Sequence, residues 1–295
     1  MQIAKLGYVG FNTPDVEAML AYYTNVLGLT LVERSGDGAA YLRNVLDHHT
    51  IVLYPAKEQG LRHIGLQLGS GQTLTGAAAQ LREQGIAVET QSDAQPGVAE
   101  QLQLTDPEGT ILHLYSAMEQ VHAPFPEGSI VPEKLGHIAL GVSDVQNIAD
   151  FYQRVLGFRV SDWIEDFFVF MRCSPDHHSM NFVRSKYQRM NHIAFQLQDW
   201  AHVQRACDHL YKHSIPLIWG PGRHGAGHNI FTYHRNPDGQ IVELFTELDI
   251  MLNEDLGYFE PRPWHEEFPQ RPKVWKADLT ATNHWGAMPP PEFLD

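Results

Sequence analysis

The sequence repeats itself at an offset of 129 residues. The segment LGYVGFNTPDVEAMLAYYTNVLGLTLVE, which starts at Leu6, aligns with LGHIALGVSDVQNIADFYQRVLGFRVSD, which starts at Leu135. Farther along, at the same offset, an HIGLQL run of the first copy matches an HIAFQL run of the second. A repeat of this length predicts a duplicated structural unit. We therefore expect two similar domains, over residues 1–125 and 126–255, which we call the first and the second half.

Each half is itself composed of two smaller units. A strand-like run precedes apolar residues at helical spacing, and that pattern ends at a glycine typical of a helix C-terminus, Gly28 or Gly157. A second strand and helix follow in each half (HIGLQL then LTGAAAQLREQG, and HIAFQL then AHVQRACDHLYKH). The expected fold class is α+β, with four such units in two domains. Residues 256–295 are rich in proline and tryptophan, and we expect an irregular C-terminal strap over the domains.

The composition restricts the class of partner. A formal net charge of −14 repels phosphate, so we expect neither nucleic acid nor an anionic membrane as a partner. No apolar run reaches the about 20 residues of a membrane helix, and the sequence does not start with a signal-peptide pattern. Cys173 and Cys207 are too few for a disulfide scaffold or a thiolate zinc site. This cysteine usage fits a cytoplasmic protein.

Three potential metal ligands lie on predicted strands of the second half. Period-two alternation puts His137 and His192 on strand faces that they share with small residues, which suits a cavity. Glu243 interrupts an apolar strand, where a carboxylate is costly to bury unless it is paired or binds a metal. Any one of these residues alone is more often an ordinary buried polar group. Together, two histidines and a carboxylate form the facial set that holds Fe(II) and leaves positions open.

A signature-like segment surrounds the third of these residues. The stretch GPGRHGAGHNIFTYHRNPDGQIVELF contains His224, Tyr233 nine residues later, and Glu243 ten residues after the tyrosine. It resembles the signature of the type I extradiol ring-cleavage dioxygenases, the catechol 2,3-dioxygenase and 2,3-dihydroxybiphenyl dioxygenase family of the vicinal oxygen chelate superfamily. Thr232 departs from that signature, which has an apolar residue there. The resemblance covers about residues 3–250.

The resemblance implies a fold, an activity and a set of site residues. The fold would be four βαβββ modules paired into two tandem glyoxalase/dioxygenase-type domains. The activity would be extradiol (meta) cleavage of a catecholic substrate with O2, which gives a muconic semialdehyde-type product in aromatic hydrocarbon catabolism. The enzyme would be a non-haem Fe(II)-dependent homo-oligomer, with Mn(II) as the alternative metal. The implied metal ligands are His137, His192 and Glu243, and the implied catalytic residues are His177, His224 and Tyr233.

Two adjacent histidines compete for one of these roles. His177 lies fifteen residues before His192, as in the family, and strand alternation predicts that it faces the cavity while His178 points away. The resemblance implies that His177 donates a proton as the oxygen–oxygen bond breaks. His224 and Tyr233 would hydrogen-bond the substrate oxygens and fix their ionisation.

The first half provides an internal comparison. His48, His63 and His113 occupy the positions of His177, His192 and Glu243, but Tyr8 replaces the histidine at 137. We therefore expect a structural domain without a complete metal site.

Two other functions are compatible with such a fold. One is a glyoxalase-like metal-dependent isomerase or lyase, which uses a metal-bound glutamate as its base. The other is a non-catalytic module that binds an aromatic ligand and has no need of a metal. Neither requires the trio of His177, His224 and Tyr233, so the spacing of those residues favours the dioxygenase.

Overall fold

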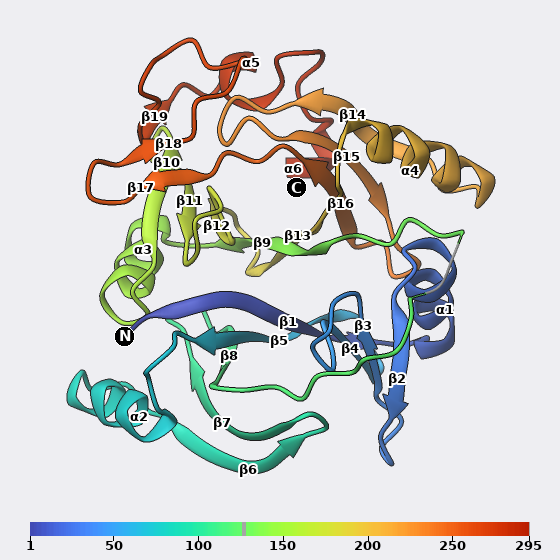
Figure 1. Ribbon diagram of the computed structural model, residues 1–295, viewed down its shortest axis with the longest axis vertical. Helices are drawn as coiled ribbons and strands as arrows, with labels where there is room; N and C mark the ends of the chain where they lie inside the picture. Colours follow the sequence, from blue (N-terminus) through green and yellow to red (C-terminus); the bar gives the residue numbers. More distant parts are fainter. Residues whose placement is uncertain (126–127, 295) are drawn as a thin grey trace.

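The computed structural model describes residues 1–125 and 128–294 and contains one large sheet from each half of the chain (Figure 1). Residues 126–127 and 295, which include the predicted start of the second half and the last residue of the strap, lie outside the described residues. The first sheet has the strand order β2-β3-β4-β1-β5-β8-β7-β6. Its strands are β1 (Ile3–Thr13), β2 (Thr30–Arg34), β3 (Ala40–Arg43), β4 (Ile51–Pro55), β5 (Gly60–Leu68), β6 (Glu89–Gln95), β7 (Val98–Thr105) and β8 (Ile111–Tyr115).

The second sheet has the order β14-β15-β16-β13-β9-β12-β11-β10-β19. Its strands are β9 (Lys134–Val142), β10 (Arg159–Ile164), β11 (Phe168–Arg172), β12 (Met180–Arg184), β13 (Arg189–Gln196), β14 (Leu217–Arg223), β15 (Ile230–Arg235), β16 (Ile241–Thr246) and β19 (Lys273–Trp275). A separate pair consists of β17 (Met251–Asn253) and β18 (Tyr258–Phe259). The helices are α1 (Val16–Ala21), α2 (Leu74–Glu83), α3 (Val145–Arg154), α4 (Trp200–Lys212), α5 (Leu279–Thr282) and α6 (Pro291–Leu294).

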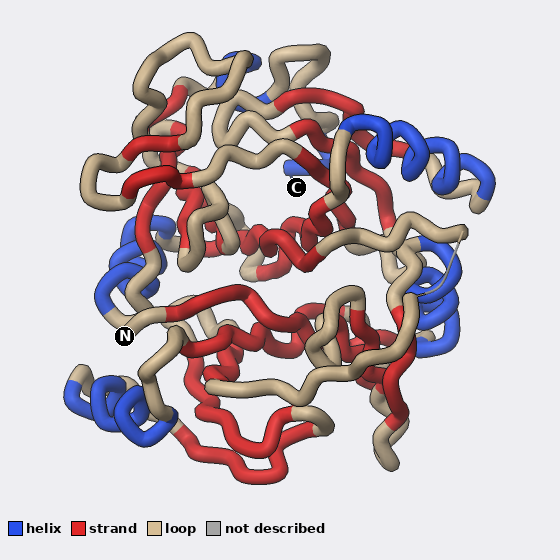
Figure 2. The backbone as a smooth tube through the Cα atoms, viewed as in Figure 1, coloured by secondary structure: helices blue, strands red, loops and turns tan. Residues whose placement is uncertain are grey.

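The two sheets confirm the predicted α+β fold and its duplication. In the first half β1 pairs in parallel with β4 and antiparallel with β5, and β9 pairs in the same way with β12 and β13. Figure 2 shows the longer helices on the outside, whereas the central strands of the two halves face each other across the middle. No helix of the described residues is both long and apolar enough to span a membrane.

The predicted helices form where their caps and apolar spacing place them. Asp15 accepts a hydrogen bond from Ala18 N at the start of α1, and Asp144 accepts one from Asn147 N at the start of α3. The first helix continues as a π-helical turn, η1 (Tyr22–Val26), before Gly28 turns the chain at a φ of 79°. The same sequence pattern therefore gives the same strand–helix unit twice.

Buried polar contacts join the two halves. Tyr22 Oη lies 2.7 Å from His234 Nε2, and Tyr152 Oη donates to Asp106 at 3.2 Å. The Glu108 carboxylate accepts backbone hydrogen bonds at the start of α3. The halves thus share one continuous apolar core with specific polar links across it.

The C-terminal strap is more regular than predicted. Its strand β19 extends the second sheet by pairing in parallel with β10, with Asp162 opposite Lys273 and Ile164 opposite Trp275. A strand of three residues is too short to show a period in the sequence. The strap is therefore partly built into the second sheet.

Candidate metal centre

Neighbouring strands bring the three predicted ligands together. Glu243 on β16 is paired with Ala194 on β13, and Ala194 is paired with His137 on β9. His192 is paired with Ala139, two residues along β9 from His137. Alternation puts all five side chains on one face of the sheet. The small alanines leave room between the longer side chains.

The donor atoms lie close to one another. His137 Nε2 is 3.0 Å and His192 Nε2 is 3.2 Å from the same oxygen, Glu243 Oε2, and the two nitrogens are 3.2 Å apart. All three side chains are buried. Bonds of about 2.1 Å at right angles around a metal ion would separate its ligands by about 3.0 Å. The spacing fits one face of an octahedral ion.

The hydrogen bonds around His192 leave its Nε2 able to bind a cation. Asn191 Nδ2 donates to the Phe293 carbonyl, so its Oδ1, 2.8 Å from His192 Nδ1, accepts the proton of that nitrogen. His192 Nε2 then has a lone pair facing the carboxylate oxygen. Burial lowers the pKa of His137, which favours its neutral, metal-binding form. The residues present therefore fit a divalent cation.

A residue that the sequence analysis missed orients the carboxylate. Asn229 Nδ2 donates to Glu243 Oε1 at 2.9 Å, which leaves Oε2 for the two histidines. Asn229 is fully buried in the loop before β15. In the sequence, only its position inside the signature-like segment could have indicated this role of Asn229. Asparagine is common in the turns of glycine-rich loops, so its residue type alone gives no indication.

His224 and Tyr233 lie beside this group of three residues. His224 Nε2 is 3.0 Å from Tyr233 Oη and 4.0 Å from Glu243 Oε1. Thr282 of α5 accepts the proton of His224 Nδ1 at 2.6 Å, so Nε2 is free to accept from the tyrosine. Burial lowers the pKa of His224 to about 4 and raises that of Tyr233 well above its ordinary value. Both side chains are therefore neutral at pH 7.

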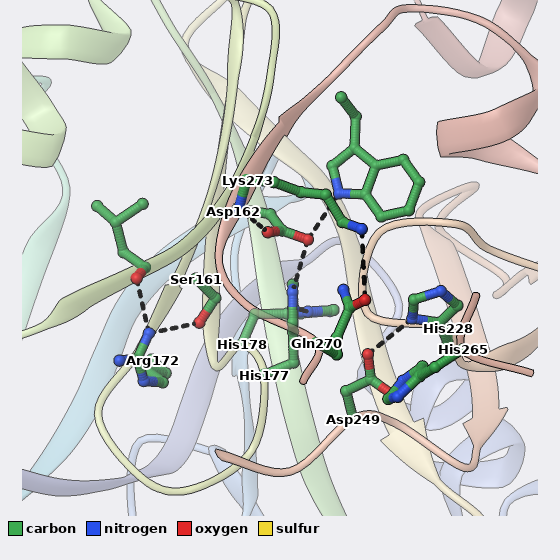
Figure 3. A network of polar contacts seen from close by, with 12 residues as sticks. Ser161, Asp162, Arg172, His177, His178, His228, Asp249, His265, Gln270 and Lys273 are labelled. Carbon is green, nitrogen blue, oxygen red and sulfur yellow. Dashed lines mark hydrogen bonds and ion pairs between the residues drawn. The ribbon is translucent and has the colours of Figure 1, made fainter. Parts of the chain in front are cut away.

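The prediction for the adjacent histidines was wrong about which one faces the centre. The His178 ring packs edge-on against His137, with centroids 4.3 Å apart, whereas His177 Nε2 contacts Asp162 Oδ2 at 3.1 Å (Figure 3). Both histidines lie in an irregular segment before β12, where the alternation of an extended strand does not apply. Burial, and next the neighbouring imidazole of His137, lower the pKa of His178 well below its ordinary value.

Aromatic rings enclose the centre on the side of Tyr233. Trp219 of β14 stacks on Tyr233 at 5.4 Å, and Phe293 of α6 packs edge-on against Tyr233 at 4.8 Å. A cavity of about 1120 Å³ lies between the two halves and reaches Asn191 and Phe293, but the three ligands do not line it. Two apolar rings thus pack around the tyrosine that lies beside the ligands.

A second buried group of histidine and carboxylate has a different geometry. His228 Nδ1 contacts Asp249 Oδ2 at 2.7 Å, and His265 Nε2 contacts the other oxygen, Oδ1, at 2.8 Å (Figure 3). Each Asp249 oxygen thus contacts one imidazole, whereas a single oxygen of Glu243 contacts both His137 and His192. We interpret this group as a hydrogen-bonded link that holds the strap, through His265, to the second half.

The equivalent space in the first half is filled by a tyrosine. Tyr8 Oη lies 3.0 Å from His113 Nδ1, and the His63 and His113 rings pack 4.2 Å apart. Within the described residues 1–125, no three potential ligands lie as close together as in the second half. That the first half is purely structural stays a prediction.

His63→Ala is expected to leave the metal content and kcat of the protein within about twofold of wild type, because His63 lies outside the metal centre. The cost should appear in stability, since the substitution leaves a cavity beside Tyr8. Thermal unfolding and turnover measured on the same preparation check this. A loss of bound metal in this variant would contradict a structural first half.

Comparison with known families places the fold. The chain matches the family described as Glyoxalase/Bleomycin resistance protein/Dioxygenase superfamily twice, over residues 5–114 and 134–244. It therefore belongs to this superfamily, and its two matches correspond to the two copies of the repeat.

Individual relatives and solved structures show which members of the superfamily this chain is similar to. The manganese-dependent 2,3-dihydroxybiphenyl 1,2-dioxygenase of Geobacillus genomosp. 3 is 26% identical over 299 residues, which cover 93% of this chain and 94% of the relative. The 1,2-dihydroxynaphthalene dioxygenase of Sphingobium xenophagum is 29% identical over 82% of this chain and 88% of its own. Among solved structures, a Mn(II)-bound glyoxalase from Novosphingobium aromaticivorans superposes with a TM-score of 0.86 at 28% identity, covering 100% of this chain and 94% of that one. Homoprotocatechuate 2,3-dioxygenase from Arthrobacter globiformis shares the fold, with a TM-score of 0.83 at 23% identity over 99% and 91% of the two chains.

Proposed function

We propose that this protein is an extradiol dioxygenase that cleaves the ring of a catecholic substrate beside its two hydroxyl groups. Both atoms of O2 enter the product, a muconic semialdehyde-type compound. The observation that carries the proposal is the facial group of His137, His192 and Glu243 with a further set of histidines and a tyrosine around it. The relatives that match most of the chain bear names of this activity.

The metal in this proposal is Fe(II), with Mn(II) as the alternative. His137, His192 and Glu243 would hold it on one face and leave the other positions open. When bound, the cation would make the catechol hydroxyls more acidic and bring both reactants to one place. Manganese has specific support, because one relative is named manganese-dependent and one structural neighbour is described as Mn(II)-bound.

The neutral side chains around the centre would orient the substrate and move its protons. Tyr233 and His224 form a hydrogen-bonded pair next to Glu243 and can donate to or accept from the catechol oxygens. We assign to His178 the acid–base role that strand alternation had given to His177, because His178 packs against His137. His178 would accept a catechol proton and return it as the oxygen–oxygen bond breaks.

The aromatic walls favour catechols with an extended ring system as first substrates. Trp219 and Phe293 flank Tyr233 with flat apolar surfaces, and the relatives' names include 2,3-dihydroxybiphenyl and 1,2-dihydroxynaphthalene. A homo-oligomer and a cytoplasmic location remain our predictions.

Metal exchange separates this proposal from a glyoxalase-like isomerase, which the name of one structural neighbour brings into consideration. Protein stripped by a chelator is reloaded with Fe(II), Mn(II) or Zn(II), and the yellow cleavage product of 2,3-dihydroxybiphenyl is followed. We expect Fe(II) or Mn(II) to restore activity and Zn(II) to bind without restoring it, because Zn(II) has no redox chemistry. Ring cleavage by protein that retains no metal would contradict the proposal.

A further inference from the structure

We propose that Asp162 and His177 are positioning residues that hold His178 in one tautomer, with its proton on Nδ1 and its Nε2 directed to the substrate. The C-terminal strap would contribute by fixing Asp162. This inference rests on the proposed function for its consequence in catalysis. The hydrogen-bonded chain itself is a property of the structure.

The series of hydrogen bonds begins at Asp162 on β10, and the side chain of Asp162 is almost completely buried. Its Oδ1 accepts from the backbone N–H of Lys273 at 2.8 Å (Figure 3). Its Oδ2 accepts from the indole N–H of Trp275 at 2.7 Å. These two groups can only donate, so both carboxylate oxygens act as acceptors. The third contact, 3.1 Å from Oδ2 to His177 Nε2, then requires the proton to be on that nitrogen.

This assignment fixes the direction of the next hydrogen bond. With its proton on Nε2, neutral His177 has a lone pair at Nδ1, which lies 2.9 Å from His178 Nδ1. His178 Nδ1 must therefore donate, which leaves a lone pair at His178 Nε2. Among the described residues Nε2 of His178 has no hydrogen-bond partner, and the ring lies against His137. The free nitrogen is the one available to a catechol.

The tautomer has a chemical consequence. A free Nε2 can accept the proton of a catechol hydroxyl, and the Asp162 carboxylate at the far end of the chain stabilises the positive charge that His178 then carries. The same proton can be returned as the oxygen–oxygen bond breaks, so the step needs no further proton donor. The opposite tautomer would present an N–H to the substrate and could not accept the proton.

The first half contains a looser copy of this series of hydrogen bonds. Glu33, His48 and His49 lie 129 residues before Asp162, His177 and His178. The two imidazoles are 3.2 Å apart at Nδ1, but Glu33 Oε2 is 3.6 Å from His48 Nε2 and its side chain is 45% exposed. Only the copy next to the metal centre has its carboxylate buried and held by the strap.

Three variants test the inference. His177→Phe removes the acceptor for His178 Nδ1–H, whereas His177→Asn restores an acceptor oxygen near the position of Nδ1. His48→Phe makes the matched change in the first half. With the Fe(II) enzyme, we expect His177→Phe to lower kcat about 10- to 100-fold with little change in KM. His177→Asn should recover most of kcat, and His48→Phe should leave it unchanged.

A second measurement does not depend on turnover. Long-range ¹H–¹⁵N spectra of ¹⁵N-histidine protein loaded with diamagnetic Zn(II) distinguish protonated from unprotonated ring nitrogens, and the His178 signals are those lost in His178→Ala. We expect a protonated Nδ1 in the wild type and a mixture of tautomers in His177→Phe. A protonated Nε2 in the wild type would overturn the inference. A kcat of His177→Phe equal to that of the wild type, of His177→Asn and of His48→Phe would overturn it as well. Failure of the wild type to cleave any catechol would instead refute the proposed function and leave the tautomer result valid.

Discussion

Glu243→Ala is expected to abolish both metal retention and ring cleavage. Glu243 provides the only negative charge of the centre, and its Oε2 is the atom that both histidine nitrogens approach within 3.2 Å. Without the carboxylate, two neutral imidazoles remain, a set too weak to keep a divalent ion through dialysis. Elemental analysis after dialysis and the rate of product formation measure the two losses.

His113→Gln is the matched control for this change, because His113 occupies the position of Glu243 in the first half. It should retain the wild-type metal content per folded chain. Unchanged metal content in Glu243→Ala would show that the metal, if the protein binds one, is held elsewhere.

His178→Ala is expected to separate binding from chemistry. The variant keeps all three metal ligands, so metal content and the affinity for a catechol under anaerobic conditions should remain near wild type. Because the imidazole next to His137 would no longer accept and return a proton, kcat should fall about 10²- to 10⁴-fold. Anaerobic substrate titration and steady-state oxygen uptake provide the two numbers.

His49→Ala serves as its control, since His49 is the equivalent residue in the first half. A His178→Ala enzyme that turns over at the wild-type rate in saturating oxygen would rule out the acid–base role of His178. A large loss in His49→Ala as well would point to a general effect of the histidine pair on folding.

The sequence could predict that His137, His192 and Glu243 share one face of the sheet because each of them lies within a regular strand. The period of two put His137 and His192 on the same sheet face as small residues, and the apolar neighbours of Glu243 indicated its burial. The structure brings these three residues together from strands that are adjacent in the sheet. Strand alternation and apolar neighbours were sufficient to predict that these three side chains lie together.

The surroundings of the centre were harder to predict because they depend on irregular or distant segments. His178 was given the wrong orientation since it lies in an irregular segment, where side chains do not alternate. Asp162 contacts Trp275, and His224 contacts Thr282, across more than fifty positions of sequence, and a single sequence has no pattern for such contacts. The strap was expected to be irregular, although its β19 joins the second sheet and fixes Asp162.

The most direct test of ring cleavage uses anaerobic protein reconstituted with Fe(II) and mixed with catechol or 2,3-dihydroxybiphenyl. The mixture is then exposed to air while its visible spectrum and oxygen uptake are recorded. We predict a yellow product with one O2 consumed for each substrate molecule. An absence of oxygen uptake with either Fe(II) or Mn(II) across a small panel of catechols would contradict the dioxygenase function and favour an isomerase or a ligand-binding protein on the same fold.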